Sequence, residues 1–311
     1  MMLSIFAFPK PFRGHIATIQ RNAISSWVRL RPQCEIFLFG NEEGTAEVAK
    51  EFGACHVSEI ARNEYGTPLL SDVFEKGEQL AKYGLLCYVN CDIILGSEFI
   101  RAVEKVSRWT QRFLMVGECW NLDLAEPLAF DRPVWEENLK ALVRQRGKRR
   151  GPFSIDYFVF PRRLYQQIPP FALGRPRFDQ WLIWKARHLG AAVVDATPMV
   201  MAVHQNHDYS HMPDGLPPHI FPGEEAIRNE KLAGGLRHCY GIGEATHKFL
   251  ATGLKRNWVG HLRLKFLWRR AKRMQGTFFW RARDLTRSPR HALGLHIGKM
   301  KRFKALVTGQ R

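Results

Sequence analysis

The most informative stretch of this chain is LLCYVNCDIIL, from Leu85 to Leu95. Apolar residues follow one another almost without a break, which is typical of a strand buried on both faces, as in a parallel sheet covered by helices. Asn90 and Asp92 stand where this strand would end, and open α/β sheets bind ligands at the carboxyl ends of their strands. Because a buried carboxylate is costly without a partner, Asp92 predicts a bound metal, a ligand or a cluster of N–H groups.

Strand and helix patterns alternate on both sides of this stretch. The repeated order predicts an α/β fold, a doubly wound and mostly parallel sheet with helices on both faces. We expect Gly53 and Gly84 to terminate helices. Up to residue 119 the predicted strands are 3–8, 34–39, 55–60, 85–95 and 113–119, and the predicted helices are 14–30, 45–52, 71–83 and 97–107.

The pattern changes after Trp120. Residues 121–151 mix acidic and basic side chains and end in RQRGKRRG, which predicts a polar excursion over the surface. Regular structure is expected to resume with a strand at 155–160, a helix at 178–189 opened by Asp179, and a strand at 191–203. That last strand runs into the polar segment HQNHDYSH.

The positive charge of the chain is concentrated at its C-terminal end. The net charge is +18, and residues 251–311 hold 17 of the 47 Lys and Arg but one of the 29 acidic residues. We therefore predict a near-neutral domain over residues 1–250 and a basic, aromatic-rich helical tail over 251–311. The six cysteines form no C-x-x-C pair and no stretch of about eighteen apolar residues occurs, so a cytoplasmic protein with reduced thiols is expected.

Three stretches carry a resemblance to a known family: YVNCDIIL (88–95), DYFVFPRRLYQQIPPFALGRPRFDQW (156–181) and VHQNHDYSH (203–211). Together with the order of elements from Leu3 to Leu250, they resemble GT-A-type nucleotide-sugar glycosyltransferases, in particular an uncharacterised bacterial and plant group. The resemblance implies a GT-A-like fold and metal-assisted transfer of a sugar from a nucleoside diphosphate to a hydroxyl of a glycan or lipid-linked acceptor, with inversion expected. The usual motif has two acids, whereas this chain has Asn90 in place of the first.

A divalent cation would suit this chemistry, because the departing nucleoside diphosphate is multiply charged. Asp92 is the candidate ligand; the alternative is a capping Asp at a strand end. The resemblance adds His204, the late histidine, as a second ligand, although an ordinary loop histidine is the competing interpretation. Carboxylate and water with one imidazole favour Mn or Mg over a closed zinc site.

The acceptor hydroxyl must lose its proton to a base. Asp179 resembles the base of the family by its position after the Gly174 loop, but an Asp at the start of a helix is also a favoured N-cap. Asp156 is the second candidate catalytic residue, and its alternative is a structural hydrogen bond at a strand edge. Both interpretations of each residue stay open in the sequence.

Residues after the first strand are candidates for binding the nucleotide sugar. Phe8 would face the base, while Lys10 and Arg13 would pair with the diphosphate; a solvated basic loop is the alternative. Asp72 precedes the Asp92 motif at the distance where related enzymes place a base- or sugar-contacting residue, and is otherwise a helix cap. The carbonyl of Asn90 would contact a ribose, a water or a cation. No Walker loop or G-x-G-x-x-G occurs.

Basic and aromatic residues alternate in the tail, over residues 254–304. This pattern favours a helix lying on an anionic membrane surface, which would make the enzyme peripheral on the inner face of the membrane. A nucleic-acid-binding protein and a solvated helix are the alternatives for the tail. A nucleotidyltransferase on the same sheet is a further alternative for the body. No specific nucleic-acid partner is expected.

Overall fold

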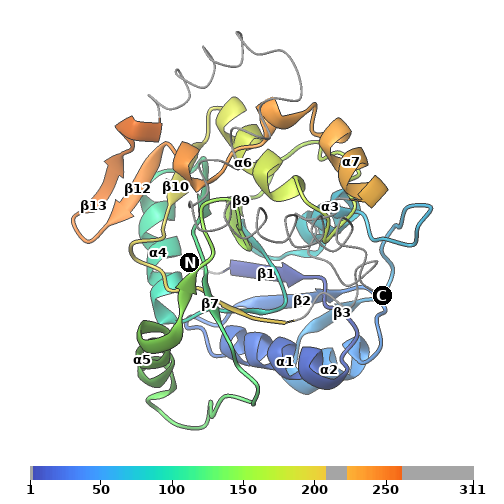
Figure 1. Cartoon of the computed structure of the whole chain (residues 1–311), viewed down its shortest axis with the longest axis vertical. Helices are drawn as coiled ribbons and strands as arrows, with labels where there is room; N and C mark the ends of the chain where they lie inside the picture. The colour runs from blue at the N-terminus through green and yellow to red at the C-terminus, as the bar shows by residue number, and fades with distance from the viewer. Residues whose placement is uncertain (1–2, 208–222, 261–311) are drawn as a thin grey trace, which may run out of the picture. The chain divides into compact units, whose positions relative to one another are not determined.

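The computed structural model describes residues 3–207 and 223–260. Within these residues, nine strands form one sheet in the order β13-β12-β10-β6-β9-β4-β1-β2-β3 (Figure 1). The strands of this main sheet are β1 Leu3–Ala7, β2 Glu35–Phe39, β3 Cys55–Val57, β4 Leu85–Val89, β6 Phe113–Val116, β9 Tyr157–Pro161, β10 Ala192–Asp195, β12 His247–Leu250 and β13 Gly253–Arg256.

Most neighbouring strands of the main sheet are parallel. β1 pairs in parallel with both β2 and β4, and β10 pairs in parallel with β6 and β12. The exceptions are β9, antiparallel to β4 and β6, and β13, antiparallel to β12. Since the chain runs outward from β1 to β3 and then returns to β4 on the other side of β1, the sheet has a switch point between β1 and β4. Ligands of such sheets bind at the carboxyl ends of the strands at this point.

Helices cover both faces of the main sheet. On one face α1, α2 and α4 pack through Trp27, Val48 and Phe99 against strand residues such as Ile5 and Cys87. On the other face α3 and α6 pack against the opposite side chains of the same strands. The helices are α1 Gly14–Val28, α2 Thr45–Phe52, α3 Leu70–Leu80, α4 Ser97–Trp109, α5 Trp135–Arg146, α6 Phe178–His188 and α7 Gly223–Leu232, with short 3₁₀ turns at Leu236–His238 and Ile242–Glu244. The predicted α/β class with a mostly parallel sheet is confirmed.

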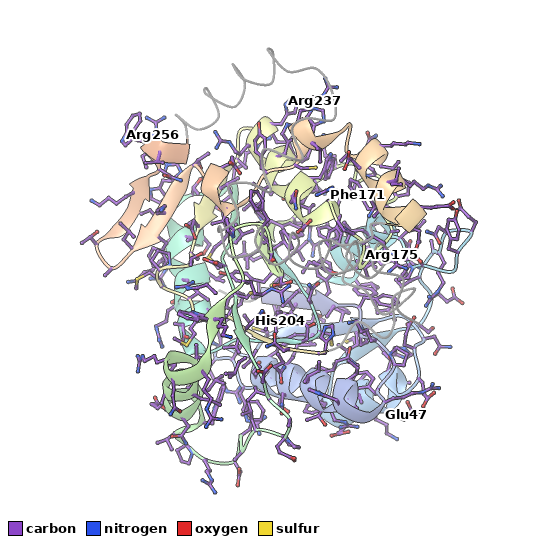
Figure 2. The ribbon with its side chains drawn as sticks, in the orientation of Figure 1. Glu47, Phe171, Arg175, His204, Arg237 and Arg256 are labelled. Atoms are coloured by element: carbon purple, nitrogen blue, oxygen red, sulfur yellow. The ribbon has the colours of Figure 1, made fainter. Side chains whose placement is uncertain are left out.

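A second, four-stranded sheet lies beside the first, in the order β5-β11-β7-β8. Its strands are β5 Ile93–Ile94, β7 Trp120–Leu122, β8 Lys148–Arg149 and β11 Val203–Gln205. Helix α5 packs on one face of it through Leu139 and Val143. His204, on β11, lies in the interior of the molecule, whereas Glu47 and Arg256 project at its periphery (Figure 2).

Two predicted strands are each divided between the two sheets. The run from Leu85 to Leu95 forms β4 in the main sheet, turns at 90–92 and continues as β5 in the small one. The run from 191 to 203 likewise gives β10 in the main sheet and leads into β11 in the small one. An apolar run signals burial but not the sheet to which a residue belongs, so the turn between the strands was not predicted.

Other expectations were wrong at element ends. Gly84 does not cap α3, which ends at Leu80 with an extended Ala81 after it. Gly53, in contrast, follows α2 in the left-handed conformation at φ 65°, as predicted. Residues 121–151 are not an irregular excursion, because they contain α5 and two strands of the small sheet.

The compact unit that holds both sheets runs from Met1 to His261. The predicted boundary after residue 250 falls inside the β12–β13 hairpin, and β13 adds an edge strand to the main sheet. The predicted helical tail lies outside the described residues from 261 onward. All six cysteines are free thiols, and all but Cys55 are buried.

Phe74 on α3 provides a test of the packing between helix and sheet. Its ring is 3% exposed and stacks on Phe160 of β9 at 5.4 Å between centroids. We expect Phe74→Ala to lower the free energy of unfolding by about 3–5 kcal/mol, because it leaves a cavity between α3 and the sheet. Leu80→Ala, at an exposed position of the same helix, should cost less than about 1 kcal/mol. Equal losses in urea denaturation would contradict this packing.

Candidate metal and active site

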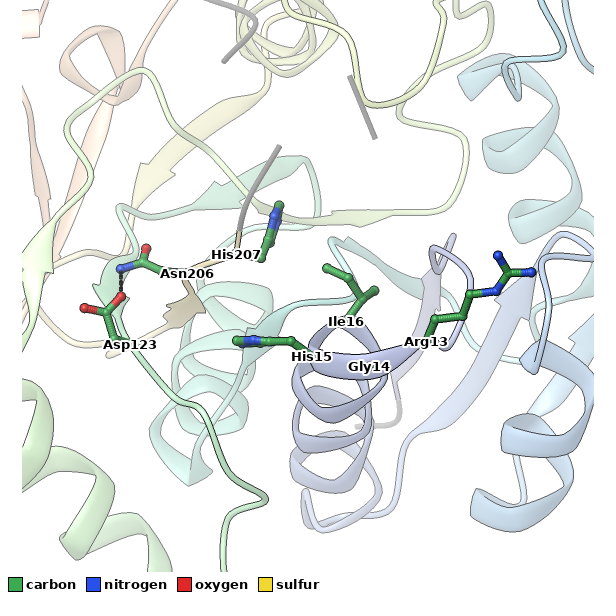
Figure 3. A pocket seen from close by; sticks show the side chains of 7 residues that line it. All are labelled: Arg13, Gly14, His15, Ile16, Asp123, Asn206 and His207. Atoms are coloured by element: carbon green, nitrogen blue, oxygen red, sulfur yellow. Dashed lines mark hydrogen bonds between the residues drawn. The ribbon is translucent and has the colours of Figure 1, made fainter. Parts of the chain in front are cut away.

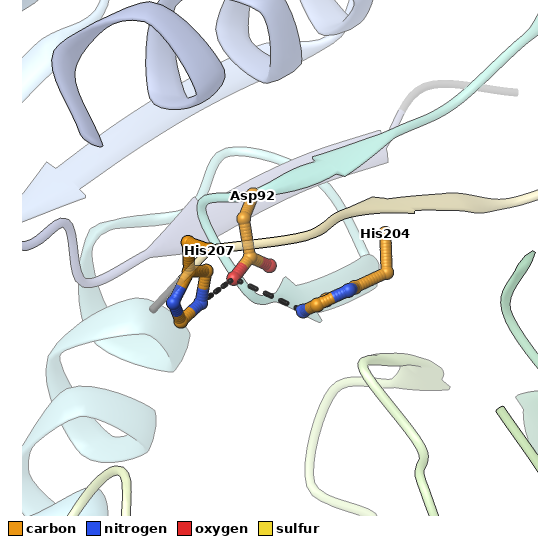
Figure 4. Close-up of side chains that lie close together, drawn as sticks. All are labelled: Asp92, His204 and His207. Atoms are coloured by element: carbon orange, nitrogen blue, oxygen red, sulfur yellow. Dashed lines mark hydrogen bonds and ion pairs between the residues drawn. The ribbon is translucent and has the colours of Figure 1, made fainter. Parts of the chain in front are cut away.

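Three potential metal ligands gather at the switch point of the main sheet. Asp92 follows β4, His204 lies on β11, and His207 follows β11 by two residues. Their ligand atoms all lie within 4.8 Å of one another. Nε2 of His207 is 3.2 Å and Nε2 of His204 is 3.6 Å from the same carboxylate oxygen, Oδ2 of Asp92 (Figure 4).

A buried amide network holds this group in place. The side chain of Gln205, between the two histidines, donates hydrogen bonds to the carbonyl oxygens of Asp92 (3.1 Å) and Ile19 (2.7 Å). It accepts one from Nδ2 of Asn22 at 2.9 Å. Gln205 and Asn22 are 0% and 2% exposed, so these bonds are shielded from competing water. They fix β11 to the Asp92 turn and to α1.

The electrostatics suit ligand roles for both predicted residues. Burial raises the pKa of Asp92, but the neighbouring His204 and His207 imidazoles and the Lys10 ammonium outweigh it and hold the pKa below its usual range. Burial lowers the pKa of His204. At neutral pH the carboxylate is therefore ionised and this imidazole neutral, which are the forms that ligate a metal.

The donor atoms also fit a divalent cation. Oδ1 of Asp92 is buried without a hydrogen-bond partner, and buried polar atoms are rarely left so. The sequence predicted one imidazole at the site, whereas the geometry brings two. One carboxylate and two imidazoles suit Mn²⁺ better than Mg²⁺, since Mg²⁺ prefers oxygen ligands throughout.

The second acidic candidate, Asp156, has a polar neighbour at each oxygen of its carboxylate. Oδ1 accepts a hydrogen bond from Nδ2 of Asn90 at 2.9 Å, and Oδ2 lies 3.3 Å from Nε of Arg150. Asn90 also donates its backbone N–H to the Asp156 carbonyl. The structure thus gives Asn90 the task of holding Asp156.

Asp179 lies in a different environment. Burial raises its pKa to about 7, and the charge of Asp156 adds to the rise. Its Oδ1 is buried without a hydrogen-bond partner. The N-cap of α6 is Arg177, in an unusual backbone conformation at φ 94°, and no side chain caps the helix. The alternative interpretation of Asp179 as the N-cap of α6 is therefore wrong, because the residue lies in the first helical turn.

Tyr88, at the end of β4, connects the three acidic candidates. Burial raises its pKa, and the negative charges of Asp92, Asp156 and Asp179 raise it further. Three carboxylates from segments as far apart as residues 92 and 179 thus affect one phenol. Each of the three acids was a candidate in the sequence.

A cavity of about 730 Å³ opens beside the metal ligands (Figure 3). Its walls come from the start of α1 and from residues at the ends of β7 and β11. Arg13 lines it but is exposed and pairs with Glu43. The lining residues are Arg13, Gly14, His15, Ile16, Asp123, Asn206 and His207.

The remaining nucleotide-binding candidates have different surroundings. Nζ of Lys10 lies 3.3 Å from Nε2 of His207, beside the metal ligands. Phe8 is half-buried, with the Arg62 guanidinium 5.7 Å from its ring centroid. Asp72 accepts a hydrogen bond from the Ala61 N–H at 2.7 Å and pairs with Lys76 at 3.1 Å. These contacts give Asp72 a structural task in holding the preceding loop.

Three residues of this site were missed in the sequence. His207 was visible only as part of the cluster of histidines after β11, and its approach to Asp92 depends on the pairing of β11 with β5. Arg150 was assigned to a surface segment, and Gln205 had no distinguishing signal. Asp208 and His211, the other members of that cluster, lie outside the described residues.

Comparisons with known proteins give a remote likeness. No protein-family model matches the sequence, and no curated protein does. Among solved structures, glucosyl-3-phosphoglycerate synthase from Mycobacterium tuberculosis matches at 18% identity and a TM-score of 0.47, over 75% of this chain and 81% of that chain. Its complex with Mg²⁺ and uridine diphosphate matches at 17% identity and a TM-score of 0.46, over 75% and 80% of the two chains. At these values a likeness does not assign an activity.

Removal of one ligand should weaken metal binding sharply. We expect Asp92→Asn and His204→Gln to reduce Mn²⁺ affinity by more than the roughly 10- to 100-fold that loss of an outer-shell partner costs. Asp123→Asn is the matched control, because it also removes a carboxylate of the cavity lining. Among the residues drawn in Figure 3, the Asp123 carboxylate is hydrogen-bonded to Asn206 alone. Calorimetric titration of Mn²⁺ measures the affinity of each variant. Equal Mn²⁺ affinities in wild type and Asp92→Asn would contradict a metal site at Asp92.

Asp179 should also make folding stability depend on pH. Its folded pKa of about 7 lies above the ordinary value of 3.8, so its favourable contribution is fully present below that ordinary value and is lost as pH rises through about 7. Asn does not ionise and escapes this loss. Asp179→Asn should therefore unfold at higher denaturant concentration than wild type at about pH 8, with the difference shrinking toward about pH 5. Parallel stability curves would contradict an Asp179 that binds a proton near neutral pH.

Proposed function

We propose that this chain is a metal-dependent glycosyltransferase that moves a sugar from a nucleoside-diphosphate donor to a hydroxyl of a glycan or lipid-linked acceptor. The observation that supports it most is the group Asp92, His204 and His207 at the switch point of the sheet. Nearby Asp179 has a pKa of about 7. A cation at the first group would neutralise the leaving diphosphate, and a carboxyl that titrates near neutrality would take the proton of the acceptor hydroxyl.

Asp92, His204 and His207 would hold Mn²⁺ or, with more water ligands, Mg²⁺. Such a cation neutralises the charge that develops on a leaving diphosphate. The chain supplies further positive charge through Lys10, which approaches the same ligands from the end of β1. In the mechanism that we propose, these groups stabilise the departing nucleoside diphosphate.

The cavity beside the ligands is the proposed donor site. Its volume of about 730 Å³ is in the range of small-molecule and cofactor pockets. The first turn of α1 contributes three lining residues and contains no acidic side chain. The backbone N–H groups and dipole of this helix end favour phosphate. Lys10 and Arg13 would add charge for the diphosphate, and Phe8 would offer a ring to the base.

Asp179 is the proposed general base, and Asp156 a positioning residue. Asp156 is held by Asn90 through a hydrogen bond and by Arg150 through an ion pair, which suits a positioning residue. Asp179 has a buried oxygen without a partner, which would accept the proton of the acceptor hydroxyl as that hydroxyl attacks the sugar. With Asp179 as the base, the reaction that we propose is inverting.

In this proposal the basic tail determines where the protein is located and which acceptors it reaches. Residues 254–304 would bring the enzyme to an anionic membrane surface from the cytoplasmic side, where lipid-linked acceptors are accessible. Trp258 is 64% exposed at the start of this segment. Within residues 3–207 and 223–260, no helix has the length and apolar character needed to cross a bilayer.

A turnover assay tests the proposed base. With Mn²⁺ and a panel of nucleotide sugars, wild type should release nucleoside diphosphate at a rate that falls as pH drops below about 7, because Asp179 takes up a proton. Asp179→Asn should lower this rate by about 10²–10⁴-fold. The affinity for Mn²⁺ with UDP or GDP should be unchanged, since Asp179 is not a ligand.

Three results would contradict the proposed function. Full turnover in Asp179→Asn would remove its catalytic role. Release of pyrophosphate from a nucleoside triphosphate and a sugar phosphate would identify a nucleotidyltransferase instead. No binding of UDP or GDP, with salt-sensitive binding of nucleic acid, would identify the body as a scaffold for the basic tail.

A further inference from the structure

The face of the small sheet that bears His204 extends from the metal ligands across β7 to β8. His204 of β11 is in register with Asn121 of β7, and Asn121 is in register with Lys148 of β8. Laterally paired residues project from the same face of a sheet, because side chains alternate along every strand. His204, Asn121 and Lys148 therefore form a row on the face that carries the metal ligands. Lys148 is two strand spacings from His204, about 10 Å.

The opposite face of this sheet is closed. Val203, Trp120 and Arg149 form the neighbouring row, and Val203 and Trp120 pack against α5 through Leu139 and Val143. The Arg149 guanidinium lies 4.2 Å from the centroid of the Trp120 ring. The two basic residues of β8 therefore project from opposite faces of the small sheet, Arg149 from the face covered by α5 and Lys148 from the face that carries the metal ligands.

Arg150 extends the site-facing row. Its backbone N–H donates to the Cys119 carbonyl, which continues the pairing of β8 with β7. It therefore follows Lys148 by two residues on the same side. Its side chain is engaged by Asp156 at 3.3 Å and by Oδ1 of Asn121 at 3.1 Å. Lys148 is exposed and forms no ion pair with any residue of 3–207 or 223–260.

The surrounding charge is also positive. Arg144 and Arg146, in the last turn of α5, precede β8 and are exposed. Neither pairs with an acidic side chain in the described part of the chain. Lys148 is an exposed cation of the site-facing row, and positive charge near a reaction centre raises the local concentration of anions. Lys148 does not line the proposed donor cavity, so its charge is available to another ligand.

We propose that Lys148 binds an anionic group of the acceptor, a phosphate or a carboxylate, and so orients the acceptor hydroxyl toward the reaction centre. This inference rests on the proposed function. It specifies the acceptor as an anionic molecule whose charged group lies about 10 Å from the metal ligands, a span of two strand spacings. The lysine contributes a charge-assisted hydrogen bond at an otherwise solvent-exposed edge strand.

Calorimetric titration of small probes tests the inference. The full chain, saturated with Mn²⁺ and UDP, is titrated with glucose 6-phosphate, glucuronate and glucose. We expect wild type to bind one or both anionic probes and to prefer them to glucose. Lys148→Gln should weaken this binding by about tenfold or more, the worth of one charged hydrogen bond. Arg149→Gln, which removes the same charge from the opposite face of the same strand, should change it by about twofold at most.

Three outcomes would overturn the inference. Equal loss in Lys148→Gln and Arg149→Gln would indicate diffuse attraction by the basic segment. Loss of Mn²⁺-dependent UDP affinity in Lys148→Gln would place the lysine in the donor site, and no preference of wild type for anionic probes would remove the anion site. If wild type does not bind UDP, the proposed function fails separately, and the probes alone still test Lys148. A preference between the two anionic probes identifies phosphate or carboxylate as the group.

Discussion

Only 15% of the Asp92 side chain is exposed, yet the residue is ionised. A carboxylate in such a place needs positive charge or hydrogen-bond donors around it. The main sheet delivers Lys10 from the end of β1, and the small sheet delivers His204 and His207. Because one oxygen of Asp92 still has no partner, the protein groups alone do not satisfy this carboxylate. A divalent cation would complete its surroundings.

The small sheet supplies two of the groups that surround Asp92. The turn after β4 allows the chain to leave the main sheet, so that β5 can pair with β11 and bring His204 to Asp92. Gln205 then ties β11 to α1 through Asn22. The same sheet extends to β8, whose two faces separate Lys148 from Arg149. One architectural feature thus positions the metal ligands and the proposed anion site.

Much of the fold could be predicted because buried strands and amphipathic helices leave periodic signals in sequence. Helix α5 was missed because only Leu139 and Val143 are buried on it, which leaves too narrow an apolar stripe. Asp92 could be named from its position at a strand end, and His204 from the resemblance to GT-A-type glycosyltransferases. The hydrogen bonds that separate Asp156 from Asp179 as candidate bases, in contrast, depend on long-range pairing that no local pattern encodes.

Electron paramagnetic resonance of Mn²⁺ bound to the full chain would test the central claim most directly. The proposed site predicts hyperfine coupling to the imidazole nitrogens of His204 and His207, reduced in His204→Gln, and phosphorus coupling that appears when UDP or GDP is added. These couplings would place a nucleoside diphosphate on the metal at the switch point of the sheet. Bound Mn²⁺ without nitrogen coupling, or without phosphorus coupling in the presence of either nucleotide, would contradict the proposed active site.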